Sequence, residues 1–168
     1  AELSWETVEA MLLSPRNNGV RGDLIILIQA LQLARIIGKC IKNQERSETL
    51  DRFFGDDQWL NYFKERRSRG ERIRELIIEY YVKNIKKLRR DTVIEIIKVT
   101  TDDKKDLNYV LLFITNKTLA GNPWMEKVRA IKKFIEQETP NTINNAISAI
   151  YGKPQTLLDI IEYDTMTK

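Results

Sequence analysis

The feature that most constrains the fold is the short link between two β-prone segments. Residues 92–99 alternate partly between apolar and polar side chains, and residues 109–114 form a continuous apolar run. Only residues 100–108 separate them, and they carry no helical pattern. Because a parallel crossover needs a dozen or more residues, the two segments are predicted to pair antiparallel, as a hairpin.

A third β-prone segment, residues 24–28, reads Leu-Ile-Ile-Leu-Ile without alternation. Such a run is typical of a strand that is buried on both faces of a parallel sheet. Helical patterns precede it at residues 5–12 and follow it at residues 31–41. The order helix, strand, helix predicts an α/β protein with one parallel core strand and a terminal antiparallel hairpin.

The remaining apolar patterns predict helices flanking this sheet. Residues 138–168 are expected to form a small helical tail in two pieces, and residues 1–137 a single α/β domain. The other expected helices lie at residues 47–54, 57–63, 71–88 and 124–137.

Composition excludes several kinds of chemistry. The 168 residues contain no histidine and one cysteine, Cys40, so an internal disulfide, a thiolate metal cage and a histidine base are all excluded.

The longest apolar run is residues 24–28, far short of the roughly 20 residues of a membrane-spanning helix, and no signal-peptide pattern is present. We therefore expect a cytoplasmic protein without a membrane partner.

Positive charge is concentrated in one segment. Residues 64–90 contain 11 Lys and Arg against 4 Glu, a net charge of +7, whereas the rest of the chain carries −3. This asymmetry is compatible with a surface that faces nucleic acid. The candidate nucleic-acid-binding residues are Lys64, Arg66, Arg67, Arg69, Arg72, Arg74, Lys86, Lys87, Arg89 and Arg90.

A simpler interpretation competes with nucleic-acid binding. Glu65 and Arg69, and likewise Glu79 and Lys83, are four residues apart, as on a solvated helix face with internal ion pairs. This interpretation is the favoured one, because nothing in the segment indicates base readout. The aromatic residues in and beside the segment could stack on unpaired bases, but their spacing favours a place in the core. They are Trp59, Tyr62, Phe63, Tyr80 and Tyr81.

Three other candidate sites are not favoured. Asp56 and Asp57 suit the cap of a helix better than a metal, so no metal site is predicted. Glu95 and Lys98 are three apart on a predicted strand and therefore point to opposite faces, which argues against a metal-dependent nuclease. Cys40 has no histidine to act as its base and is expected to be inert despite its lysine neighbours.

The ordered string of motifs resembles the C-terminal half of the three-Cys-motif partner family, whose members are class I methyltransferases thought to use S-adenosylmethionine. The match spans roughly residues 3–134, and its most specific piece is Phe-Phe-Gly-Asp-Asp-Gln-Trp at residues 53–59. The other residues that carry it are Leu3-Ser4-Trp5-Glu6-Thr7-Val8, Asp23-Leu24-Ile25-Ile26 with Arg35, Leu50-Asp51-Arg52, Tyr80 or Tyr81, Tyr109-Val110-Leu111-Leu112-Phe113, Lys117 and Met125.

The resemblance implies the C-terminal part of a Rossmann-like class I methyltransferase sheet, in which the last strand runs against the others. In that family the glycine-rich cofactor loop and the acid after the second strand lie N-terminal to anything present here. The chain thus looks like a fragment that could bind S-adenosylmethionine only with a missing N-terminal half, its expected partner. No catalytic or cofactor-binding residue carries over to this sequence.

Two functions remain open at this point. The first is the C-terminal portion of a methyltransferase that acts on or near nucleic acid, lacks its own cofactor-binding loop and is not catalytic alone. The second is a noncatalytic module that binds nucleic acid or protein, with its tail (residues 142–163) docking on a partner.

Overall fold

Three strands and the helices around them make up the part of the chain that the computed structural model describes, residues 3–15, 22–100, 106–116 and 123–137. The strands are β1 (Leu24–Ile28), β2 (Thr92–Thr100) and β3 (Leu107–Asn116). The helices are α1 (Trp5–Leu12), α2 (Ala30–Asn43), α3 (Glu48–Phe54), α4 (Trp59–Ser68), α5 (Ile73–Leu88) and α6 (Pro123–Gln137). The expected helical tail and its boundary at residue 138 lie outside the described residues.

The sheet has the order β1-β3-β2, and both pairings are antiparallel. The predicted hairpin of β2 and β3 is confirmed. The prediction that residues 24–28 form a parallel strand is wrong, because β3 returns between β2 and β1 and pairs with both. The described part of the protein is therefore an α/β structure with a three-stranded antiparallel sheet.

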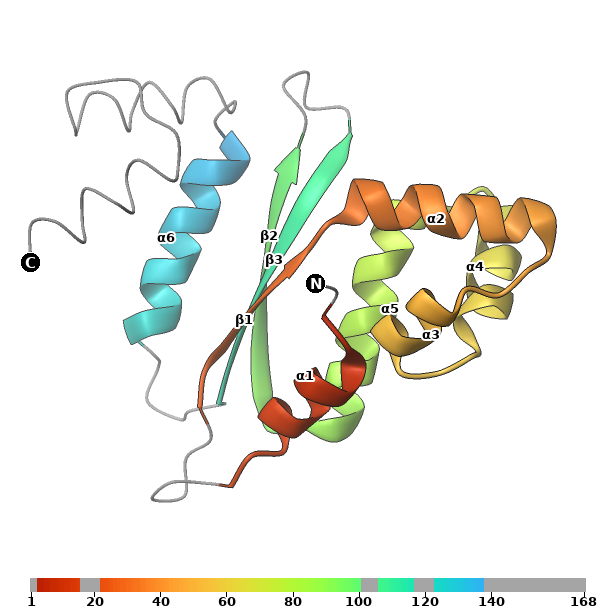
Figure 1. The fold of residues 1–168 in the computed structure, drawn as a ribbon. Coiled ribbons are helices and arrows are strands. Elements are labelled where there is room, and N and C mark those ends of the chain that lie inside the picture. The colour runs from red at the N-terminus through yellow and green to blue at the C-terminus, as the bar shows by residue number, and fades with distance from the viewer. Residues whose placement is uncertain (1–2, 16–21, 101–105, 117–122, 138–168) are drawn as a thin grey trace, which may run out of the picture.

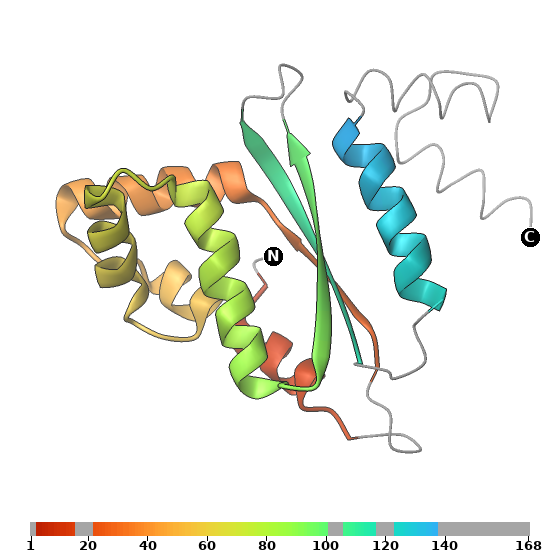
Figure 2. The same ribbon diagram turned by 180° about the vertical axis from the view of Figure 1, so that it is seen from behind.

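Helices cover the two faces of the sheet unequally (Figure 1). Of the described helices, α1 to α5 lie on one face and α6 lies on the other, as the reverse view also shows (Figure 2). Side chains of β3 alternate between the two layers: Val110, Leu112 and Ile114 are buried with α1 to α5, whereas Leu111 and Phe113 pack in the smaller cluster of α6.

Burial of β1 also differs from expectation. Ile26 and Ile28 are buried against the large helical layer, but Ile25 and Leu27 point to the α6 face and are 60% and 52% exposed. Helix α6 packs mainly on β2, so it leaves the β1 side of this face open. The continuous apolar sequence of β1 was therefore not a sign that both faces of this strand are buried.

The Phe-Phe-Gly-Asp-Asp-Gln-Trp motif forms the joint between α3 and α4. Phe53, Phe54 and Trp59 are buried in the main core, and the Trp59 indole N–H donates to Asp51 at 2.7 Å. Gly55 ends α3 with a left-handed backbone (φ 76°), and it faces the ring of Trp5. The motif thus has a packing role in this structure.

Replacing Gly55 with Ala is expected to destabilise the protein by about 3 kcal/mol or more, through backbone strain and overlap of the new Cβ with the Trp5 indole. Gly70→Ala is a matched control: Gly70 also has a positive φ (84°), but no atom lies near its would-be Cβ. The control is expected to cost only about 1 kcal/mol. Urea unfolding measures both, and equal losses would show that the Trp5 contact is unimportant.

Candidate nucleic-acid interface

The ten predicted nucleic-acid-binding residues lie on α4, on the link to α5, and on α5 and its C-terminal end. They do not form one basic surface. Seven have exposed side chains, Arg66 and Arg74 are partly buried, and Arg89 is buried. Their neighbours decide which of them are available to a ligand.

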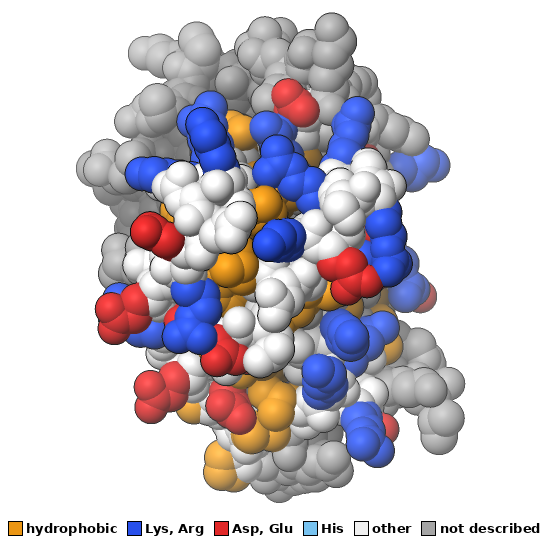
Figure 3. All heavy atoms as spheres, turned by 90° about the vertical axis from the view of Figure 1, so that its right-hand side faces the viewer, with side chains coloured by type: hydrophobic (Ala, Val, Ile, Leu, Met, Phe, Trp, Pro, Cys, Tyr) orange, Lys and Arg blue, Asp and Glu red, His pale blue; other side chains and the backbone are white. Residues whose placement is uncertain are grey.

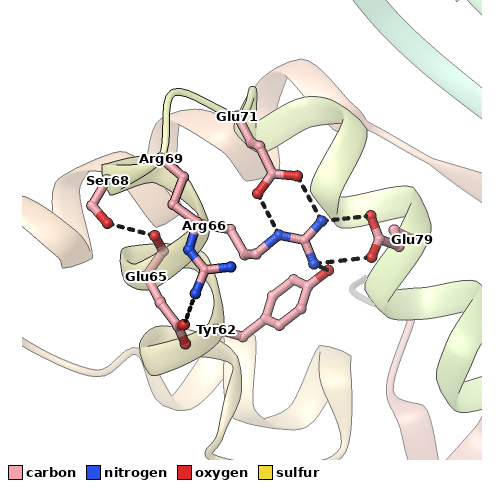
Figure 4. A network of polar contacts seen from close by, with 7 residues as sticks. All are labelled: Tyr62, Glu65, Arg66, Ser68, Arg69, Glu71 and Glu79. Carbon is pink, nitrogen blue, oxygen red and sulfur yellow. Dashed lines mark hydrogen bonds and ion pairs between the residues drawn. The ribbon is translucent and has the colours of Figure 1, made fainter.

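Arg66 is the centre of an internal polar network between α4 and α5 (Figure 4). Its guanidinium binds Glu71 through Nε and Nη2 and binds Glu79 through Nη1 and Nη2. The same group lies over the Tyr62 ring, 5.4 Å from its centroid. The bond with Arg66 also lowers the pKa of Glu71. Arg66 therefore joins two helices, and its guanidinium is already engaged by two carboxylates.

Two more of the predicted nucleic-acid-binding residues, Arg69 and Arg74, form ion pairs with nearby carboxylates. Arg69 pairs with Glu65, as the four-residue spacing predicts. Arg74 pairs with Asp106 at 3.1 Å and donates to the Leu107 carbonyl at 3.2 Å, which ties α5 to the start of β3. The other predicted surface pair, Glu79 with Lys83, is replaced by Glu79 with Arg66.

Arg89 differs most from the expected surface position, because it is only 3% exposed. Its Nη1 donates to the Gly22 carbonyl at 3.0 Å, and its Nη2 donates to the Asn116 side-chain oxygen at 2.8 Å. It thereby holds Gly22, two residues before β1, and the end of β3 at the C-terminal end of α5. A buried, hydrogen-bonded guanidinium serves the fold and is not available to bind nucleic acid.

A basic groove lies between α5 and the edge of β2, which run side by side in Figure 2. Its open volume is about 580 Å³. Its floor is apolar, made by Ile78, Val82 and Ile96. Its rim carries four exposed cations, Lys83, Lys86, Lys87 and Arg90, and we call this site the basic groove.

The four cations of the basic groove have no ion pair among the described residues. The one acid in its lining, Glu79, is bound to Arg66. Lys83 is absent from the ten predicted residues, although the spacing 83, 86, 87 places it on one face of α5 with Lys86 and Lys87, and Arg90 follows just after the helix. That spacing is the signal that could have found it.

A second hollow of similar volume, about 580 Å³, lies where α5 begins. It contains Arg67 and Arg72, but Glu71, Glu75 and Asp106 line it too. These acids balance most of its positive charge. Figure 3, which views the helical layer, shows acidic side chains mostly on the left and Lys and Arg at the lower right.

The aromatic residues are core residues, as their spacing indicated. Trp59, Phe63, Tyr80 and Tyr81 are buried, and Tyr62 is half-buried against Phe63 and Tyr80. None of them lines the basic groove. Four of these five rings are therefore not accessible to unpaired bases.

The less favoured candidate sites also have structural roles. Asp56 accepts hydrogen bonds from the Tyr80 hydroxyl at 2.6 Å and from the Gln58 backbone at 2.9 Å, and Asp57 pairs with Arg46. No group of three potential metal ligands occurs in the described residues. Burial raises the pKa of the Cys40 thiol, which agrees with an inert cysteine.

Glu95 and Lys98 point to opposite faces, as predicted from their spacing. Glu95 binds Arg129 and Lys132 of α6, whereas Lys98 binds Glu75 of α5. Glu95 and Lys98 therefore do not come together as the carboxylate and lysine of a nuclease site.

No helix in the described ranges is long and apolar enough to cross a membrane.

Comparison with protein-family models, with curated proteins and with solved structures finds no match to this chain.

Raising the pH is expected to destabilise the protein between pH 10 and about pH 12. Burial, with a hydrogen bond to Glu79, raises the pKa of Tyr62 from 10.0 to about 12. The unfolded chain thus loses this proton from about pH 10 while the folded chain keeps it, so stability present below pH 10 is lost as the pH rises. Urea unfolding at several pH values should show a smaller loss for Tyr62→Phe, and identical pH profiles would contradict this account.

Proposed function

We propose that the chain binds nucleic acid through the basic groove, by contacts to the phosphate backbone and without base recognition. The observation that carries the proposal is the set of four exposed cations, Lys83, Lys86, Lys87 and Arg90, that have no acidic partner among the described residues. Ion pairs with carboxylates neutralise the charges of Arg66, Arg69 and Arg74, but no such pair neutralises these four cations. The simpler interpretation of the segment is therefore incomplete.

The dimensions of the groove suit a phosphate backbone. Lys83 and Lys87 are four residues apart on α5, about 6 Å along the helix, and Arg90 follows two residues after the helix ends at Leu88. That length corresponds to about two phosphate steps of one strand at about 3.4 Å each. Lysine ammonium groups act as point charges that suit phosphate oxygens, and the groove offers no aromatic ring for base stacking. This combination favours duplex nucleic acid held by charge.

Replacing Lys83, Lys86, Lys87 and Arg90 together with Gln is expected to abolish most duplex binding. If the unmodified protein makes four phosphate contacts, the logarithm of its association constant should fall with the logarithm of the salt concentration with a slope of about −3.6. The slope of the variant should be close to zero. Fluorescence anisotropy over a salt series measures both quantities.

The matched control removes the same charge elsewhere, from Arg35, Lys39 and Lys42 of α2 and Arg52 of α3, which are all exposed. This control should retain the slope of the unmodified protein. An equal loss in the two variants, or a salt-independent affinity, would refute a specific role of the groove.

A second proposal concerns the protein to which this chain belongs. We infer that it is the C-terminal portion of a methyltransferase-like protein that acts on or near nucleic acid. The support is the sequence resemblance together with the sheet, in which β1 and β2 point the same way and the last strand, β3, runs against both. On this proposal an N-terminal half supplies the loop for S-adenosylmethionine.

Calorimetric titration of the chain with S-adenosylmethionine is expected to give no binding heat, because the proposed cofactor loop belongs to the missing half. The reading frame upstream of residue 1 should encode a glycine-rich loop after a strand. Cofactor binding by this chain alone, or a stop codon directly upstream, would contradict the second proposal and would leave the first untouched.

A further inference from the structure

Two arginines in the second hollow, at the start of α5, have no ionic partner. Three acids line this hollow, and each of them is already bound by a cation. The pairs are Glu71 with Arg66, Glu75 with Lys98 and Asp106 with Arg74. Arg67 and Arg72 also line the hollow, are exposed, and form no ion pair within the described ranges. The acids therefore balance most of the charge of the hollow but leave these two guanidinium groups free.

The second hollow and the basic groove lie along one seam, where α5 and β2 run side by side (Figure 2). On β2, Ile96 lines the basic groove, and Lys98 and Thr100 line the second hollow. Alternate residues of a strand share one face. On α5, Glu75 of the second hollow and Glu79 of the basic groove are one helical turn apart. The two sites thus follow one another on the same side of the molecule.

We propose that one B-form duplex binds both sites, with its axis along α5. The basic groove contacts the phosphate backbone of one strand, and Arg67 and Arg72 contact the backbone of the other strand. This inference rests on the proposed function of the basic groove. It adds a second contact site, and with it the orientation and the minimum length of the bound duplex.

The distance between the two sites fits the spacing of the two backbones. Ile73 of the second hollow and Lys87 of the basic groove are 14 residues apart on α5, about 21 Å along the helix. One turn of duplex is about 34 Å long, and the major groove is the wider of its two grooves. Two backbones that flank the major groove on one face are therefore between about 17 and about 34 Å apart along the axis. The separation of the two sites lies within this range.

The side chains of the second hollow suit a phosphate contact. A guanidinium group can donate two parallel hydrogen bonds to one phosphate, so two arginines can hold two neighbouring phosphates. Arg67 belongs to α4 and Arg72 directly precedes α5, so they approach the hollow from two segments. Ala34, Ile73 and Leu107 supply its apolar surface, and none of its described lining residues is aromatic. The second hollow, like the basic groove, therefore offers no ring for base stacking.

Fluorescence anisotropy with a DNA duplex of about 18 base pairs, about 60 Å long, tests the second contact over a salt series. Six phosphate contacts should give a slope of about −5.4 for the logarithm of the association constant against the logarithm of the salt concentration. Arg67→Gln together with Arg72→Gln removes two contacts and should change this slope to about −3.6. The matched control, Lys39→Gln with Lys42→Gln, removes the same charge from exposed positions of α2 that line neither site. It should keep the slope of the unmodified protein.

The length of the duplex gives a second readout that needs no variant. In a duplex of about six base pairs the first and last pairs are about 17 Å apart, less than the separation of the two sites. Such a duplex reaches the basic groove alone, and the slope of about −3.6 expected for four contacts applies to it. The longer duplex should give the steeper slope, because it also reaches Arg67 and Arg72.

The proposed function and the second contact fail in different ways. An unchanged slope in the variant of Arg67 and Arg72, or equal slopes for the two duplex lengths, would overturn the second contact. The proposed function would still stand if the four-residue variant of the basic groove lost most of its affinity. A groove variant that binds as tightly as the unmodified protein would overturn the proposed function and this inference together.

Discussion

The position of β3 determines most of this structure. Its pairing with both β1 and β2 makes those two strands point the same way and puts each of them at an edge. Four helices, α2 to α5, must then fit between the end of β1 and the start of β2, and they do so on one face. The other face is left to α6, which follows β3. The alternating side chains of β3 supply both apolar clusters, so one strand joins the two layers.

Helix α5 shows how packing selects among charges that look equivalent in the sequence. Its inner side is buried in the core, and its outer side carries cations at regular spacing. Arg66 comes from α4 and takes Glu79, the acid that would otherwise neutralise Lys83. The basic groove keeps its charge because of this contact between helices. At the other end of α5, acids from three segments balance most of the positive charge.

Local features were predictable from the sequence. The hairpin of β2 and β3 followed from the length of its link, and the helices followed from apolar spacing. The two-residue period of a strand predicted that Glu95 and Lys98 point to opposite faces of the sheet. The helical spacing of the aromatic residues predicted that Tyr81 lies in the core. In each case the relevant atoms are a few residues apart, so chain geometry fixes their relation.

The sequence by itself therefore determined the type and place of most elements, the antiparallel hairpin and the segment that carries the positive charge. Only the tertiary structure decided that β1 is an antiparallel edge strand, that Arg89 is buried, and that Lys83 belongs to the basic groove. The physical reason is distance along the chain. Strand neighbours and ion-pair partners come from segments that are far apart in sequence, and periodicity within one segment carries no information about which other segment packs beside it.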